Sequence, residues 1–305
     1  MALDYTTTRL LALIEELGAM PLDQSTFPPV TVLRMADTQL ELAIVPVILS
    51  TRAAHFRTSV DYVTTEAAVY PIPEYAMNRS LQNVAYVSPT GEESALTPVD
   101  HDREMEEGVS WYSWATGFLG GRQGYYVSGD DLVLFPAPAA GKTLRVYYYR
   151  RPNRLVEEND AARVISVNPG TGVVTCATVP GAWAIGTSLC CVAGKPGFAL
   201  RFEARAITGV ASPTVTLGDV TGIVAGDYLA LEGDSPIPQL PVEAHALLAQ
   251  KTVCKILESL GDAKKGASDA EYTEMLRNYV NSFPLRVEQA PKRIAPRKNL
   301  LRFMG

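Results

Sequence analysis

The chain has 305 residues and a mass of 33.0 kDa, which is enough to bury a large core and to form two domains. Hydrophobic residues make up 47% and charged residues 20%, and no apolar stretch reaches the roughly 20 residues of a membrane-spanning helix. The N-terminus lacks the order of a signal peptide, so the protein is expected to stay in the cytosol in which it is made, with no membrane partner.

The net charge of −6 is unevenly distributed. Residues 284–305 hold six bases and one acid, a net charge of +5, so the other 283 residues carry −11. An acidic body with a basic, proline-punctuated tail suggests an extended arm that reaches for another molecule. A disordered, solubilising end is the alternative interpretation of the same residues.

Helical signals open the chain. Thr6–Thr8 can cap a first helix that ends at Gly18. A second helix is predicted to begin at Pro28-Pro29 and to end near Phe56, and Pro46 should kink or divide it. Its apolar positions recur at helical spacing, which predicts that it packs tightly: Leu33, Ala36, Leu40, Ile44 and Val47.

Short strands are predicted next, at residues 60–64, 68–72 and 81–88. Residues 125–136 and 143–152 are then rich in β-branched and aromatic side chains, and Gly129-Asp130 and Pro138–Gly141 supply turns, which predicts one β-hairpin. Alternation along the second run places Leu144, Val146 and Tyr148 on one face and Arg145, Tyr147 and Tyr149 on the other.

Residues 161–239 have a different character, being apolar, glycine-rich and almost neutral. They contain a weak internal repeat, in which Ile165–Thr175 resembles Ile207–Leu217 and Gly186–Val192 resembles Gly226–Glu232. Short strands at this spacing predict an all-β barrel or sandwich made of two similar halves. Because one half could not bury its apolar face alone, the halves should pack together.

The chain returns to helix from Pro241, with a break at Gly261-Asp262 and a last helix over residues 268–283. The expected fold class is therefore α+β, with a helical core, a β-hairpin or small sheet, an inserted all-β domain and an extended C-terminal arm. The expected domains are residues 1–160 and 240–283 for the core, 161–239 for the insertion and 284–305 for the arm.

Catalytic and metal-binding signals are weak. His55, His101 and His245 are scattered, and the acidic run Asp100–Glu107 is interpreted as a solvated face rather than a metal site. Residues 139–143 resemble the end of a phosphate-binding loop but lack its first glycine and its following helix. The four cysteines have no metal-binding spacing and should be reduced and buried. We therefore predict that the protein is not an enzyme and that it binds no cofactor and no metal.

The order of these features resembles the head-to-tail adaptor, or connector, proteins of tailed bacteriophages. Residues 33–52 look like the family's long helix, 69–84 like its first strands, 125–155 like its hairpin and 240–262 like its return helix. The resemblance implies a structural virion protein at the head–tail junction. It would bind beneath the portal protein and form a ring, commonly of 12 copies, that passes double-stranded DNA without specific binding and meets a downstream tail protein. The inserted domain is a departure from simpler members.

Two groups of residues are predicted to make these contacts. Tyr and Arg are enriched in interface cores, so the hairpin is expected to contact neighbouring copies through Tyr125, Tyr126, Tyr147, Tyr149, Arg150 and Arg151. The arm pairs bases with apolar anchors and is expected to bind the portal through Arg286, Lys292, Arg293, Arg297, Lys298, Leu300, Leu301, Arg302 and Phe303.

Three alternatives stay open at this point. The protein could be another tail or baseplate component whose β domain binds carbohydrate through Trp183, Phe198, Phe202 or Tyr228. It could be an enzyme, such as a hydrolase with carboxylates from distant segments, which would require a deep pocket lined by acids with shifted pKa values. The hairpin could also stack on single-stranded nucleic acid, which the acidic body disfavours.

Overall fold

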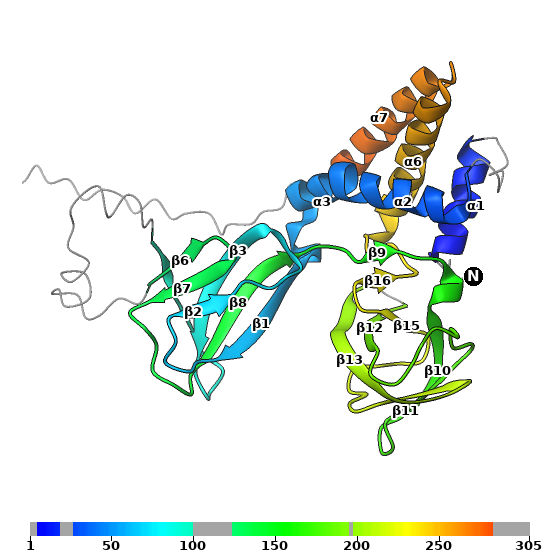
Figure 1. The fold of residues 1–305 in the computed structure, drawn as a ribbon. Coiled ribbons are helices and arrows are strands. Elements are labelled where there is room, and N and C mark those ends of the chain that lie inside the picture. The colour runs from blue at the N-terminus through cyan, green and yellow to red at the C-terminus, as the bar shows by residue number, and fades with distance from the viewer. Residues whose placement is uncertain (1–4, 19–26, 100–123, 195–197, 283–305) are drawn as a thin grey trace, which may run out of the picture.

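The structure is a computed structural model that describes residues 5–18, 27–99, 124–194 and 198–282. It is a mixed helix-and-sheet protein, as expected, with three parts: a layer of helices, a β-sandwich and a closed β-barrel (Figure 1). The barrel lies under one end of the helical layer, and the sandwich lies beside the barrel.

The helical layer joins the two ends of the chain. Helix α6 packs against α1, α2 and α7, and together they bury one apolar cluster that includes Leu33, Ile48 and Leu248. Thr6 caps the first helix as expected, because its hydroxyl accepts a hydrogen bond from the Arg9 amide at 3.5 Å. The main helices are α1 (Thr7–Gly18), α2 (Pro29–Gln39), α3 (Val45–Arg52), α6 (His245–Leu260) and α7 (Lys265–Ser282).

Pro46 divides the second predicted helix, as its chemistry requires. A proline has no amide hydrogen and its ring clashes with the carbonyl four residues earlier. The chain accommodates it with a π-helical turn, η1 (Leu40–Ile44), between α2 and α3. Leu40 and Ile44 remain fully buried across this irregular turn, so the apolar stripe predicted from the sequence is preserved.

The sandwich consists of two four-stranded sheets, with strand orders β1-β8-β3-β4 and β2-β7-β6-β5. Its core is formed by side chains that alternate inward from both sheets, such as Val84, Leu144 and Val146 from one and Leu132 and Leu134 from the other. The strands are β1 (Arg57–Val63), β2 (Val69–Pro71), β3 (Ala76–Val87), β4 (Glu93–Ala95), β5 (Thr97–Pro98), β6 (Gly124–Ser128), β7 (Asp131–Phe135) and β8 (Thr143–Arg150).

The predicted hairpin is only half correct. β6 and β7 pair as an antiparallel hairpin around Gly129-Asp130. β8, however, does not pair with β7: it crosses to the other sheet and lies between β1 and β3. The physical reason is burial, because both β7 and β8 carry an apolar inner face, and the crossing lets the two faces pack against each other.

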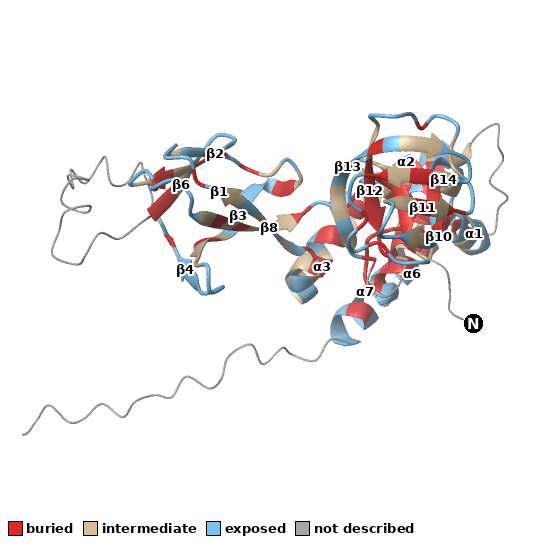
Figure 2. Cartoon of the chain, turned by 90° about the horizontal axis from the view of Figure 1, so that it is seen from below, coloured by how far each residue is buried: buried red, intermediate tan, exposed pale blue. Residues whose placement is uncertain are grey.

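Residues 162–231 form a closed six-stranded barrel with the order β10-β11-β14-β13-β12-β15. The structure thus decides between the expected barrel and sandwich. Its interior is a separate apolar cluster, which Figure 2 shows as the buried centre of this lobe. The strands are β10 (Ala162–Asn168), β11 (Val173–Cys176), β12 (Ser188–Val192), β13 (Leu200–Ala211), β14 (Thr214–Leu217) and β15 (Tyr228–Leu231).

The barrel has the internal symmetry that the sequence repeat predicts. Exchanging β10, β11 and β12 for β13, β14 and β15 leaves every strand with the same neighbours. The loops before β12 and β15 also match: the amide of Gly186 donates to the carbonyl of Ile207, and the amide of Gly226 donates to the carbonyl of Val164, both at 2.8 Å. Both glycines have positive φ, which L side chains rarely adopt.

A short connector fastens the barrel to the helices. β9 (Arg154–Leu155) pairs in parallel with β16 (Asp234–Ser235) between the two parts. Cys190 and Cys191 point to opposite sides of β12, as expected. Cys191 lies in the barrel interior, whereas Cys190 faces the connector and accepts a hydrogen bond from the Asn153 amide group at 3.3 Å. All four cysteines are free and buried.

Candidate assembly surfaces

The outer face of the sheet β1-β8-β3-β4 carries a network of charged and aromatic side chains on the strand for which the sequence predicts contacts. Arg145 donates two hydrogen bonds of 2.7 Å to Asp61 on β1 and one of 2.9 Å to Glu93 on β4. The Tyr147 hydroxyl donates to the same Glu93 carboxylate at 2.6 Å. The Arg57 guanidinium lies 4.8 Å from the centre of the Tyr147 ring.

The network keeps its acids charged. The hydrogen bond from Arg145 lowers the pKa of Asp61, and those from Tyr147 and Arg145 lower the pKa of Glu93. The same bonds raise the pKa of Arg145. Exposed ion pairs stabilise a fold only weakly. Their effect here is to hold the Arg145 and Tyr147 side chains in one orientation on the sheet surface.

The six predicted inter-subunit residues do not lie together. Tyr126, Tyr147 and Tyr149 are partly exposed, and Arg151 is exposed. Tyr125 instead lies in the sandwich core, and Arg150 is 8% exposed. Alternation along β8 could have revealed the position of Arg150, because it shares the inward parity of Leu144, Val146 and Tyr148.

Arg150 is a junction residue that links the sandwich to the barrel. Its guanidinium contacts Glu203 of β13 at 3.4 Å, donates to the carbonyl of Arg151 at 3.0 Å and lies 4.7 Å from the centre of the Tyr75 ring. Its Nε atom is buried without a hydrogen-bond acceptor among the described residues. An unpaired buried donor of a charged group is costly, so this junction is less stable than one in which every Arg150 donor is paired.

A second junction, between helices and barrel, holds acids that the sequence did not single out. Asp37 of α2 accepts a hydrogen bond of 3.3 Å from the Leu155 amide, and burial raises the pKa of Asp37 to about 6. Arg154 binds both oxygens of Asp234, at 3.0 and 3.2 Å, yet burial still raises the pKa of Asp234. Both carboxylates thus have structural partners. No sequence spacing relates Asp37 to Leu155, which is 118 residues away.

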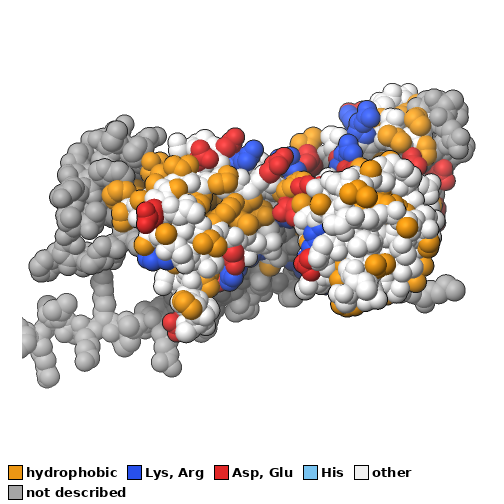
Figure 3. Space-filling view, turned by 60° about the horizontal axis from the view of Figure 1, so that its bottom comes forward, with side chains coloured by type: hydrophobic (Ala, Val, Ile, Leu, Met, Phe, Trp, Pro, Cys, Tyr) orange, Lys and Arg blue, Asp and Glu red, His pale blue; other side chains and the backbone are white. Residues whose placement is uncertain are grey.

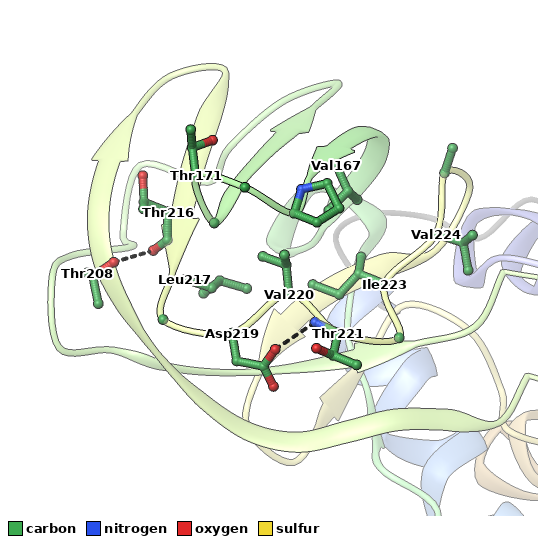
Figure 4. Close-up of a pocket in the computed structure, with 16 residues that line it drawn as sticks. Val167, Thr171, Thr208, Thr216, Leu217, Asp219, Val220, Thr221, Ile223 and Val224 are labelled. Atoms are coloured by element: carbon green, nitrogen blue, oxygen red, sulfur yellow. Dashed lines mark hydrogen bonds between the residues drawn. The ribbon is translucent and has the colours of Figure 1, made fainter.

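A hollow with a volume of about 880 Å³ lies at one end of the barrel. Its walls are the turn between β10 and β11 and the loop before β15, and Figure 4 shows Leu217, Val220 and Ile223 among the side chains that line it. Asp219 closes one side, where it accepts a hydrogen bond of 2.8 Å from the Thr221 amide (Figure 4). The lining therefore combines apolar groups with small polar ones.

The carbohydrate alternative depended on exposed aromatic side chains of the barrel domain. Trp183, Phe198 and Tyr228 are buried, at 5%, 2% and 4% exposure. Phe202 is partly exposed, and the Arg205 guanidinium lies 4.1 Å from its ring centre. The described part of the barrel domain thus presents no exposed cluster of these aromatics for a sugar.

Several candidate segments lie outside the described residues. These are the acidic run Asp100–Glu107 and the whole basic arm, including its nine predicted portal-binding residues. Within the described ranges, no group of three or more His, Cys, Asp or Glu is placed to bind a metal ion. In the same ranges, no helix has the length and apolar character needed to cross a bilayer.

Comparisons with known proteins address the family. A search of curated proteins found no match. The SU10 adaptor protein family matches residues 10–177, which is more than half of the chain. The match runs from within α1 through α2, α3, the sandwich and the first two barrel strands, whereas the return helix of the expected resemblance lies beyond it. The protein therefore belongs to the SU10 adaptor protein family, whose members are structural adaptors of bacteriophages.

Proposed function

We propose that the protein is the head-to-tail adaptor of a phage virion, which binds beneath the portal ring and connects it to the tail. The family match over residues 10–177 is the observation that carries this proposal. Such an adaptor forms a ring, with 12 copies as the expected number, and meets a downstream tail protein on its far side. Its role is structural and involves no reaction.

The charge distribution supports a passage for double-stranded DNA. Outside the basic arm the chain carries a net charge of −11. A lumen lined by such a body repels phosphates, so DNA can slide through it without binding. The basic arm, residues 284–305, has the opposite charge and is the proposed portal-binding segment, because bases next to apolar anchors suit a groove or a sheet edge on a partner.

The fixed network around Arg145 and Tyr147 supports contacts between copies. Side chains that are already ordered lose little entropy when a neighbour binds, which favours association. Many weak contacts around a ring add up to a lasting joint, even when the free protein is a monomer. Tyr126, Tyr149 and Arg151 are the other proposed contact residues that are accessible in the described protomer.

Native mass spectrometry of the portal ring tests the proposal directly. The ring is weighed before and after addition of the full-length protein, at several salt concentrations. A gain of one copy per portal subunit, or of a fixed multiple, supports the adaptor role and gives the symmetry. No gain at any salt concentration would contradict it.

A truncation tests the arm separately. A chain that ends at residue 283 retains all described helices and strands, so it should fold. We expect it to form the same sandwich and barrel but to lose attachment to the portal. A matched variant with the six bases of the arm changed to glutamine separates charge from length. Unchanged portal binding by the truncated chain would rule out the arm.

A further inference from the structure

A groove of about 340 Å³ lies between the sandwich and the barrel. One wall is formed by residues 55–60, which lead into β1, and the other by residues 198–203, which lead into β13. Figure 1 shows these two strands facing each other across the junction, and the space-filling view in Figure 3 shows charged side chains of both signs there. The volume is within the range of ligand-binding clefts.

Both walls are free strand edges in the part of the chain that the structure describes. β1 is the outermost strand of its sheet and pairs only with β8. β13 pairs with β14 only from Ile207 onward, so residues 200–206 pair on one side alone, with β12. A free edge presents unpaired amides and carbonyls, to which another strand can add.

The register identifies which residues of β1 face the groove. Arg150 donates its amide hydrogen to the carbonyl of Phe56, and Thr64 donates to the carbonyl of Lys142, each at 2.8 Å. Even-numbered residues of β1 are thus bonded to β8. The amides and carbonyls of the odd-numbered residues, Arg57 and Ser59 within the groove, point toward the free edge.

The lining charges favour an acidic occupant. Arg57, Arg150, Arg151 and Arg201 line the groove, against a single acid, Glu203. Two of the four arginines also pair with acids outside the lining, Arg151 with Glu41 at 3.6 Å and Arg201 with Asp227 at 3.3 Å. The Arg150 side chain is only 9% exposed, and its Nε atom has no acceptor in the described protomer. Because Nε is buried, an incoming carboxylate would instead form a charge-assisted hydrogen bond with the part of the Arg150 guanidinium that lines the groove.

We propose that the groove binds an extended acidic segment of another polypeptide, which adds as a strand to the free edge of β1 and places a carboxylate beside Arg150. The backbone pairing supplies affinity, and the arginines select for acidic side chains. This inference goes beyond the proposed function and does not depend on it. The groove shares Arg57 and Arg151 with the proposed contact surface between copies but does not use the basic arm, so portal binding by the arm and groove binding can fail separately.

The test uses the full-length protein and a fluorescein-labelled hexapeptide of alternating valine and aspartate, blocked at its C-terminus. Fluorescence polarisation measures its binding at low salt, beside an analogue with asparagine in place of aspartate. We expect saturable binding of the acidic peptide and about tenfold weaker binding of the neutral one, since charge-assisted hydrogen bonds are roughly twice as strong as neutral ones.

Two substitutions locate the site. Ser59→Pro removes an amide on the free edge of β1 without removing a bond to β8, and Ser59→Ala retains that amide as its matched control. We expect Ser59→Pro to weaken binding about tenfold and Ser59→Ala to bind like the parent protein. Arg150→Gln should abolish the preference for the acidic peptide. Circular dichroism verifies that each variant is folded.

Three results would overturn the proposal. They are the absence of saturable binding, equal binding of the acidic and neutral peptides, and equal binding by folded Ser59→Pro and Ser59→Ala. If Ser59→Pro does not fold, Arg150→Gln is compared with the parent protein instead. If Arg150→Gln still prefers the acidic peptide, the proposal is overturned.

Discussion

The barrel and the sandwich are both β-structures of similar size, but they are attached to the rest of the molecule in different ways. The barrel is fastened to the helices at several points, including the Thr7 amide, which donates to the carbonyl of Pro236 at 2.7 Å, and the aromatic contact between Tyr5 and Phe198. The sandwich is linked to the barrel through Arg150 and its bond of 3.4 Å to Glu203.

The barrel and the sandwich also differ in how much unpaired backbone they expose to a partner. In the barrel most strand edges are paired and the interior excludes water, so little of the backbone is left for a partner. The sandwich has an open edge at β1 and an ordered polar face on β8. The difference supports the proposal that the sandwich presents surfaces for assembly, whereas the barrel and helices form a more closed body.

The largest expected effect is the loss of a buried side chain from the barrel. Leu189 is fully buried in the barrel interior. Leu189→Ala should lower the free energy of unfolding by about 3 kcal/mol, because it removes apolar contacts and leaves a cavity. Ile185→Ala, at a position 72% exposed, should change it by less than about 0.5 kcal/mol. Urea unfolding measures both, and equal effects would contradict the barrel core described above.

A glycine in the barrel tests how closely its two halves approach. A Cβ atom added to Gly194 would collide with the carbonyl oxygen of Gly226, so the backbone would have to move. Gly194→Ala should therefore cost about 2 kcal/mol of stability. Gly181→Ala is the control, because a Cβ atom there would meet nothing within 4 Å. Thermal unfolding compares the two, and a tolerated Gly194→Ala would argue against this close approach.

The helix–barrel junction should show a pH dependence that comes from Asp37. Its pKa is raised from 3.8 to about 6 in the folded chain, so the native state binds a proton more tightly than the unfolded state. Stability should then fall as the pH rises from about 4 to 6. Asp37→Asn should flatten that slope and stabilise the protein at pH 7 by about 1 kcal/mol, discounted for partial exposure. Urea unfolding at pH 4 and pH 7 measures this, and an unchanged slope would contradict it.

Substitutions on the outer face of β8 should have the smallest effect on stability but a clear effect on assembly. Changing both Tyr147 and Tyr149 to serine should lower the free energy of unfolding by less than about 1 kcal/mol, since both rings are partly exposed. Ring formation on the portal should weaken by about tenfold or more. Val127→Ser, at a position 46% exposed near the turn between β6 and β7, is the control. A loss of folding stability as large as the loss of assembly would place these rings in the core instead.

Local signals predicted much of the fold. Proline chemistry located the start of α2 at Pro29 and the irregular turn before Pro46. The sequence repeat predicted two matching halves in the barrel domain, and the structure has them. These features depend on a few neighbouring residues, which is why the sequence alone could indicate them.

Pairings between distant segments could not be predicted in this way. The turn at Pro138–Gly141 favours a hairpin locally, but β8 pairs with β1 and β3, because the apolar faces of two sheets must meet. The junction of Asp37 with Leu155 likewise depends on how α2 lies over the connector. Arg150 was assigned to an outer surface by its residue type, although its parity along β8 indicated the inner face.

The exchange symmetry of the barrel bears on the origin of this domain. Each half contributes three strands, and every neighbour relation is preserved when the halves are interchanged. A barrel of the same strand order could therefore be built from two separate copies of one half, related by a two-fold axis. Duplication of such a half-barrel gene, followed by fusion, would give the present chain without any change in topology, and each half could then diverge on its own.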